Sequence, residues 1–163
     1  MPDARWKQFG AAGAILALDR TTKWIVETRV SFFDTHKVIP GLFEIVHSQN
    51  RGAAFGMFDG SQAGWSGWAL LVLTAAAVVA VSIILARNRG LEKWLKWGLT
   101  LILGGAAGNL FDRLAFGRVT DFLLVYIGQY QWPAFNVADS ALVIGSGLVA
   151  LDALRSTRRP RVS

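Results

Sequence analysis

The sequence predicts a mainly α membrane protein with four transmembrane helices and a small extracytoplasmic β element. Of its 163 residues, 53% are hydrophobic, and these gather in long stretches instead of spreading evenly. Basic residues cluster between and beyond the stretches, and the 7 tryptophans fall near their ends, as an interfacial aromatic belt would place them. A chain of this length fits one membrane domain, residues 1–163.

Four stretches approach the length of about 20 mostly apolar residues that a spanning helix needs. The clearest has no charged residue, and the fourth carries Asp139 near one end and Asp152 near the other. The first is the weakest, because charged residues fall in its second half. A cleavable signal peptide is the alternative there, but the apolar run leads into Asp-Arg and no small-residue cleavage site follows. In chain order the stretches are about 6–25, 64–86, 94–111 and 134–154.

The distribution of lysine and arginine predicts the orientation, because cytoplasmic loops are enriched in both. With four spans, the basic residues before the first, between the second and third, and after the fourth all lie on one side. Both termini are then cytoplasmic, and residues 155–163 form a basic cytoplasmic tail. These basic residues are Arg5, Lys7, Arg87, Arg89, Lys93, Lys96, Arg155, Arg158, Arg159 and Arg161.

The outer segment over 30–58 is too polar to span. It contains two short, imperfectly alternating runs at 37–39 and 42–47, separated by a Pro40-Gly41 turn signal. We expect a small β element on the membrane surface there.

Composition also limits the chemistry. The chain has no cysteine, 2 histidines and no His-Glu-x-x-His motif, so a thiol nucleophile is excluded and a zinc peptidase is poorly supported. The net charge of +6 would suggest nucleic acid in a soluble protein, but the membrane pattern explains it better, and we expect no nucleic-acid partner. Gly104 and Gly108 have the Gly-x-x-x-Gly spacing that favours close helix packing.

Ionisable groups inside spans are costly and are functional candidates by default. Asp19 and Lys23 are four residues apart, so they share a helix face and can pair. Asp112, Asp121 and Asp139 converge at the same outer boundary, where the third span ends and the fourth begins.

Two facing carboxylates at such a boundary cannot easily both ionise. At ~4 Å and an effective dielectric near 20 their repulsion is ~4 kcal/mol, or about three pKa units. One shared proton gives a base that activates water and an acid that protonates the carbonyl or leaving amine. The residues alone leave the pair open. Asp112 has Arg113 beside it as a counter-ion, Asp139 could be a helix N-cap, and Asp19 is a further candidate.

Five ordered blocks resemble the lipoprotein signal peptidase family, also called signal peptidase II. The resemblance covers nearly the whole chain and departs from the family pattern at Arg20, where a glutamine is usual. The blocks are Asp19-Arg20-Thr21-Thr22-Lys23, Asn50-Arg51-Gly52-Ala53-Ala54-Phe55-Gly56, Gly108-Asn109-Leu110-Phe111-Asp112-Arg113, Val119-Thr120-Asp121-Phe122 and Pro133-Ala134-Phe135-Asn136-Val137-Ala138-Asp139-Ser140.

The resemblance implies an aspartic endopeptidase in the bacterial cytoplasmic (inner) membrane, with its active site near the outer face. The expected substrates are prolipoproteins modified with diacylglycerol, cut just before the lipidated cysteine, and we expect a monomer without metal or cofactor. Asp121 and Asp139 are the implied catalytic pair. Supporting roles are implied for Asp19, Lys23, Asn50, Gly52, Asn109, Arg113 and Asn136.

Two other classes of function compete with the peptidase. A small transporter or channel would use buried acids to relay protons or ions, but such acids are expected near the midplane and often with an internal repeat. A non-catalytic membrane scaffold would have no use for carboxylates converging at one boundary. The position of the acids favours the enzyme.

Overall fold

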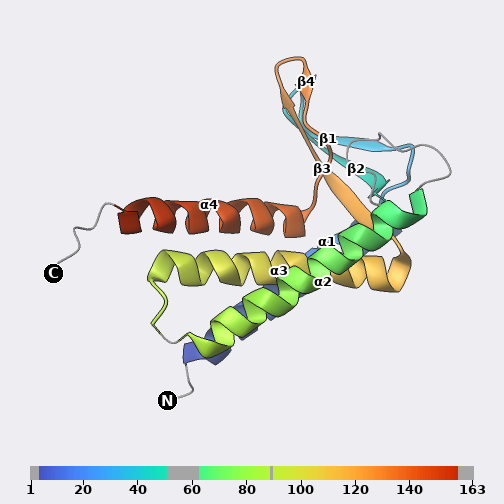
Figure 1. The fold of residues 1–163 in the computed structure, drawn as a ribbon. Helices are drawn as coiled ribbons and strands as arrows, with labels where there is room; N and C mark the ends of the chain where they lie inside the picture. Colours follow the sequence, from blue (N-terminus) through green and yellow to red (C-terminus); the bar gives the residue numbers. More distant parts are fainter. Residues whose placement is uncertain (1–3, 51–62, 89, 158–163) are drawn as a thin grey trace.

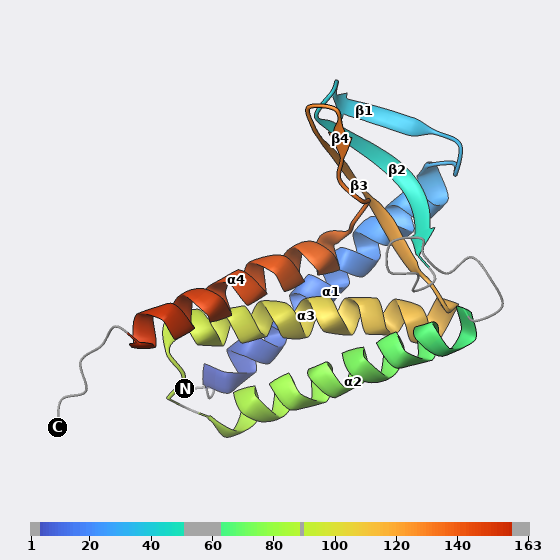
Figure 2. The ribbon, with the colours of Figure 1, turned by 45° about the horizontal axis from the view of Figure 1, so that its top comes forward.

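A computed structural model describes residues 4–50, 63–88 and 90–157 and contains four helices and one antiparallel sheet (Figure 1). The third helix packs against each of the other three. Figures 1 and 2 place the sheet at one end of the helices, while the first turn of α1 and the last turn of α4 lie at the other. The elements are α1 (Ala4–Arg29), β1 (Thr35–Ile39), β2 (Phe43–Asn50), α2 (Ala63–Arg87), α3 (Lys93–Phe116), β3 (Val119–Ile127), β4 (Tyr130–Gln131) and α4 (Val137–Thr157).

Each apolar stretch of the sequence forms a helix, but the bounds differ from the expected ones. Helix α1 continues past residue 25 to Arg29, and α3 continues past residue 111 to Phe116. Helix α4 begins at Val137 instead of at 134. The backbone before it is extended because Phe135 pairs with β3, with N–H···O distances of 2.8 and 3.0 Å to and from Leu123.

Two of the described helices are long and apolar enough to cross a membrane by length and composition: Trp68–Arg87, with a mean hydropathy of 2.8, and Val137–Ser156, with 1.7. Only 11% and 17% of these segments are buried, as expected for helices that face lipid. Helices α1 and α3 carry charged residues inside their length. The expectation of four spans therefore stays a prediction.

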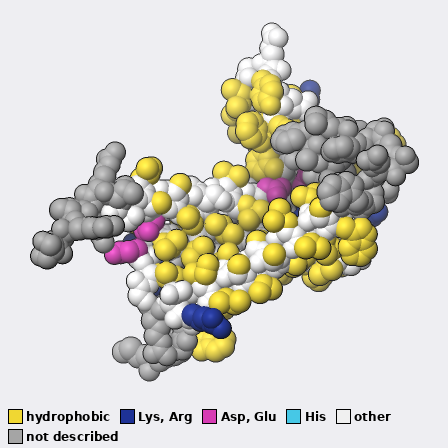
Figure 3. Space-filling model, in the orientation of Figure 1, with side chains coloured by type: hydrophobic (Ala, Val, Ile, Leu, Met, Phe, Trp, Pro, Cys, Tyr) yellow, Lys and Arg dark blue, Asp and Glu magenta, His cyan; other side chains and the backbone are white. Residues whose placement is uncertain are grey.

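Hydrophobic side chains cover much of the visible helical surface in Figure 3, and acidic side chains appear where the sheet meets the helices and at the opposite end. The described tryptophan side chains are exposed and mostly lie near helix ends, as the predicted aromatic belt requires. They are Trp6, Trp24, Trp68, Trp94, Trp97 and Trp132.

The sheet has the strand order β1-β2-β3-β4. Strands β1 and β2 confirm the predicted β element, and Gly41 takes a φ of 73° in the turn between them. Strands β3 and β4 were not expected, because no strand was predicted between residues 113 and 133. The register sets Ser48 of β2 opposite Asp121 of β3 and Asn50 opposite Val119.

Glycines on α3 allow the helices to approach closely, which confirms the interpretation of the Gly104–Gly108 spacing. A Cβ atom added to Gly104 would lie 2.7 Å from Ile15 Cβ on α1. A Cβ atom added to Gly108 would lie 2.7 Å from Asp19 Oδ2. The second contact brings a carboxylate of α1 directly against the backbone of α3.

Candidate active site

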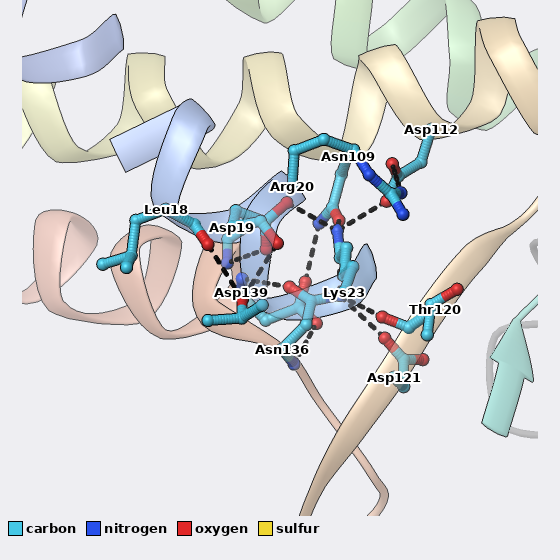
Figure 4. A network of polar contacts seen from close by, with 12 residues as sticks. Leu18, Asp19, Arg20, Lys23, Asn109, Asp112, Thr120, Asp121, Asn136 and Asp139 are labelled. Atoms are coloured by element: carbon cyan, nitrogen blue, oxygen red, sulfur yellow. Dashed lines mark hydrogen bonds and ion pairs between the residues drawn. The ribbon is translucent and has the colours of Figure 1, made fainter. Parts of the chain in front are cut away.

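Nearly all of the predicted site residues meet where the sheet joins the helices. Helices α1 and α3, strand β3 and the first turn of α4 converge there (Figure 4). Gly52, and with it most of the 50–56 block, lies outside the described residues.

The first turn of α4 is closed by reciprocal hydrogen bonds between Asn136 and Asp139. The Asp139 N–H donates to Asn136 Oδ1 at 2.9 Å, and the Asn136 N–H donates to Asp139 Oδ2 at 3.2 Å. This is the geometry of a capping box. Asp139 is therefore not the N-cap that its position in the sequence suggested. Asn136 is the N-cap, which leaves Asp139 Oδ1 for another donor.

Asn136 also holds the second aspartate of the predicted pair. Its Nδ2 donates to Asp121 Oδ1 at 2.8 Å, and its side chain is fully buried. Phe135 pairs with β3 immediately before Asn136, and this pairing brings the start of α4 to the strand that carries Asp121. One asparagine thus joins both carboxylates through its backbone and its side chain.

Asp121 lies on β3 and is only 5% exposed. Burial, followed by repulsion from Asp139, raises its pKa from 3.8 to about 6, while hydrogen bonds from Asn50 and Asn136 act in the opposite direction. Asp139 is half-buried. The pair is therefore asymmetric in its surroundings, because Asp121 is enclosed and binds a proton readily, whereas the side chain of Asp139 is more open.

Asn109 of α3 connects the pair to a buried lysine. Its Nδ2 donates to Asp139 Oδ1 at 2.8 Å, and its Oδ1 accepts from Lys23 Nζ at 3.1 Å. Lys23 is fully buried and forms ion pairs with Asp19 at 2.7 Å and Asp112 at 2.6 Å. The predicted Asp19–Lys23 pair is confirmed. Lys23 also orients the Asn109 side chain, because it donates to the amide oxygen while the amide nitrogen donates to Asp139.

Asp19 and Asp112, the other candidates for the dyad, are both engaged in structural contacts. Asp19 Oδ1 accepts the Ala138 N–H at 2.9 Å, which satisfies a free amide at the start of α4. Asp112 pairs with Lys23 and with Arg20 Nη1 at 2.8 Å. The charge of Arg113, the counter-ion that the sequence offered for Asp112, interacts with Asp112 as well, but after Asp139 and Asp121.

Arg113 turns toward the aspartate pair. Its Nη1 donates to Asn109 O at 3.4 Å, and its positive charge interacts first with Asp139 and then with Asp121. Its Nε is buried without a hydrogen-bond partner among the described residues. Arg113 is therefore placed to attract negative charge at the pair.

Sequence reasoning missed Glu27 and Thr120. Glu27 forms an ion pair with Arg20, and Glu27 Oε1 accepts from Thr120 Oγ1 at 2.7 Å. Glu27 follows Arg20 by seven residues, which is about two helical turns, so the two share a face of α1. That spacing was the signal that could have identified Glu27.

The described residues contain no group of three or more acidic or histidine side chains placed to hold a metal ion. What they contain is a pair of aspartates joined by Asn136 and backed by buried charge, in a chain with apolar, lipid-facing helices. This combination defines the class of a membrane-bound aspartic peptidase.

Comparisons of the sequence with known proteins identify the family. The family described as signal peptidase (SPase) II matches residues 11–155. A lipoprotein signal peptidase of Solibacter usitatus is 55% identical over 159 residues, covering 98% of this chain and 97% of the relative. One of Nitratidesulfovibrio vulgaris is 45% identical, covering 85% and 84%. The chain belongs to the signal peptidase II family, whose aspartic peptidases remove signal peptides from prolipoproteins.

Solved structures agree with this assignment. A bacterial membrane enzyme solved at 2.3 Å resolution matches with a TM-score of 0.83 and 28% identity, covering 96% of this chain and 93% of that chain. Another, at 1.9 Å, gives a TM-score of 0.78 and 29% identity, with coverage of 91% and 92%.

Proposed function

We propose that Asp121 and Asp139 are the catalytic dyad and hydrolyse the peptide bond together. The observation that carries this proposal is Asn136, whose backbone N–H binds Asp139 and whose Nδ2 binds Asp121. Asp19 and Asp112 are both held in ion pairs with Lys23, which leaves them less suited to proton transfer.

The two aspartates take different roles in the proposed mechanism. Asp121, whose pKa is raised to about 6, binds a proton more readily than an ordinary aspartate, and its protonated form acts as the acid. Asp139 accepts hydrogen bonds from Asn109 and Asn136 at the N-terminus of α4, where the helix dipole favours negative charge, and acts as the base.

The reaction then proceeds by general acid–base catalysis. Asp139 takes a proton from a water molecule, whose oxygen attacks the carbonyl carbon of the scissile bond. Asp121 gives its proton to the carbonyl oxygen, and a tetrahedral gem-diol forms. Transfer of the proton from Asp139 to the amide nitrogen breaks the C–N bond, while Asp121 recovers a proton from the diol, so both carboxyl groups return to their starting states.

The supporting residues position and polarise this pair. Asn109 orients Asp139, and Lys23 and Asp19 fix Asn109 and the first turn of α4. Asn50 donates to Asp121, and Arg113 faces the pair with its positive charge. The role implied for Gly52 stays a prediction.

The proposed substrate is a prolipoprotein that carries diacylglycerol, cut just before its lipidated cysteine. The exposed apolar surfaces of α2 and α4 support this, since a lipid-anchored substrate would reach the dyad by lateral diffusion. We propose a monomer with four spans in the bacterial cytoplasmic (inner) membrane, with both termini cytoplasmic. The described basic residues Arg87, Lys93 and Arg155 lie at helix ends away from the sheet, which supports that orientation.

The test is a cleavage assay with purified protein in lipid. A diacylglyceryl-modified prolipoprotein should be cut just before the modified cysteine, as mass spectrometry of both products would show, while the unmodified form is cut far more slowly. The Asp139→Asn variant should be folded and inactive, and Asp152→Asn, which changes an acid at the far end of the same helix, should retain turnover. Equal cleavage of both substrate forms would disprove the lipid requirement, and an active Asp139→Asn would disprove the dyad.

A further inference from the structure

Beyond Lys23, helix α1 carries a second charged pair that the proposed mechanism does not use. Arg20 and Glu27 form an ion pair on one face of the helix. Arg20 also lies over the Phe116 ring, with its guanidinium carbon 5.0 Å from the ring centroid. The side chains of Arg20 and Glu27 are only 20% and 28% exposed, so the pair is well shielded from water.

One series of ion pairs and hydrogen bonds, called here the first arm, connects Arg20 to Asp139, the proposed catalytic base. Arg20 Nη1 binds Asp112 Oδ1 at 2.8 Å, and Asp112 Oδ2 pairs with Lys23 Nζ at 2.6 Å. Lys23 then binds Asn109 Oδ1 at 3.1 Å, and Asn109 Nδ2 binds Asp139 at 2.8 Å. Figure 4 shows this series of side chains crossing between α1, α3 and the start of α4.

A second series of contacts, the second arm, connects the same guanidinium to the strand that carries Asp121, the proposed catalytic acid. Arg20 Nη2 pairs with Glu27, and Glu27 Oε1 accepts from Thr120 Oγ1 at 2.7 Å. Thr120 immediately precedes Asp121 in β3 and is buried. This is a side-chain contact between α1 and the strand that carries the acid.

We propose that Arg20, Glu27 and Thr120 form a positioning device that sets the distance between the two catalytic carboxylates. Asp121 is on the sheet and Asp139 is on a helix, so their separation depends on how β3 docks against α1. The two terminal nitrogens of the planar Arg20 guanidinium bind Asp112 and Glu27, so one rigid group connects both series of contacts. This inference rests on the proposed dyad and adds residues to which no role was assigned.

The device depends on the shape of arginine as well as on its charge. The planar guanidinium presents separate donors to two carboxylates, on α3 and on α1 itself, whereas a lysine ammonium is a single point charge. Among the described residues, Lys23 pairs with Asp19 and Asp112, and Arg20 pairs with Asp112 and Glu27.

The experiment measures kcat and KM per folded enzyme on a diacylglyceryl-modified prolipoprotein, well below the melting temperature. Thr120→Val removes only the hydroxyl donor and should lower kcat about tenfold with KM within about twofold, because a small misplacement of a reacting group costs rate more than binding. Thr120→Ser restores the donor and should recover most of the rate. Arg20→Lys should lose rate even though it keeps the charge.

The matched control is Arg29→Gln, which removes a positive charge from an exposed position at the same end of α1 and should turn over like the wild type. The inference is overturned if Thr120→Val matches this control per folded enzyme, or if Thr120→Ser is as slow as Thr120→Val. These outcomes require an active wild type. If wild type and control both fail to cleave, the proposed function itself has failed and the positioning role falls with it.

Discussion

Asn136 forms hydrogen bonds with both aspartates of the proposed dyad. It begins α4 as the N-cap, binds Asp139 through its backbone and binds Asp121 through its amide. The sequence alone placed Asn136 only in a supporting role, by resemblance. No spacing rule could indicate that it bridges the pair, because the bridge depends on β3, which the sequence did not predict.

The two duties of Asn136 can be separated by substitution. Serine is as good an N-cap as asparagine but has no amide to reach Asp121. We predict that Asn136→Ser keeps the cap but lowers the free energy of unfolding at pH 7 by about 1–3 kcal/mol, because Asp121 Oδ1 loses a buried donor. We also predict that it raises the pKa of Asp121 above about 6. Carbon-13 NMR of labelled aspartate can follow the titration. An unchanged Asp121 pKa would contradict the assigned contact.

Asp121 itself should be a source of instability at neutral pH. Its folded pKa is about 6 and its unfolded value is 3.8, so the folded state binds the proton more tightly. This group's contribution to stability is therefore lost as the pH rises from about 4 to about 6, by up to about 3 kcal/mol.

We predict that Asp121→Asn is inactive but more stable than the wild type at pH 7, and that this advantage shrinks toward pH 4. Denaturant unfolding in detergent at the two pH values measures the difference. Asp152→Asn serves as the control for removing a charge at the far end of α4. An Asp121→Asn variant that is less stable at pH 7 would show that the buried charge is compensated.

At the scale of elements, the close approach of α1 and α3 brings Asp19 to its place. Asp19 Oδ2 lies where a side chain on Gly108 would begin, and its Oδ1 satisfies the Ala138 N–H of α4. The Gly-x-x-x-Gly spacing indicated close packing correctly. It could not indicate which carboxylate would occupy the space that the missing side chain leaves.

We predict that Gly108→Ala destabilises the fold by about 1–3 kcal/mol, because a methyl group there would overpack the contact with Asp19. Gly147→Ala on α4 is the matched control. A Cβ atom there meets nothing within 4 Å, and alanine favours a helix over glycine by about 1 kcal/mol. Thermal unfolding of the two variants compares them. Equal melting temperatures would contradict the close contact.

The sequence predicted the first two strands but not the third and fourth. The first hairpin was predicted because its alternating residues flank a Pro-Gly turn. Strand β3 was missed, since its run Val119–Ile127 is buried at its start and does not alternate. Such a strand looks like any short apolar segment. For the same reason the start of α4 was placed three residues too early, at 134 instead of Val137.

At the scale of the whole molecule, the sequence predicted the class of fold well because long apolar stretches leave few alternatives. It predicted which polar residues would converge and the Asp19–Lys23 pair within α1, but not the ion pairs between helices. Asp112, for example, pairs with Arg20 and Lys23 of α1, a partner helix that sequence neighbours cannot indicate.

The chain contains no cysteine, so single cysteines can test the proposed orientation. Asn88→Cys lies in the exposed connection between α2 and α3, and Phe33→Cys lies beside the sheet at a position that is 97% exposed. In intact cells we predict that a membrane-impermeant thiol reagent labels Phe33→Cys but not Asn88→Cys until the membrane is opened. Labelling of both from outside would contradict the four-span arrangement.

The first measurement to make is the turnover of Asp121→Asn, Asp139→Asn and the double variant on the same lipidated prolipoprotein. Carboxylates that act as one unit lose nearly everything when either is removed, so each single substitution should lower kcat by at least about 10⁴-fold and the double no further. If one single variant kept a tenth of the wild-type rate, or if the two losses multiplied in the double variant, Asp121 and Asp139 would not be a catalytic dyad.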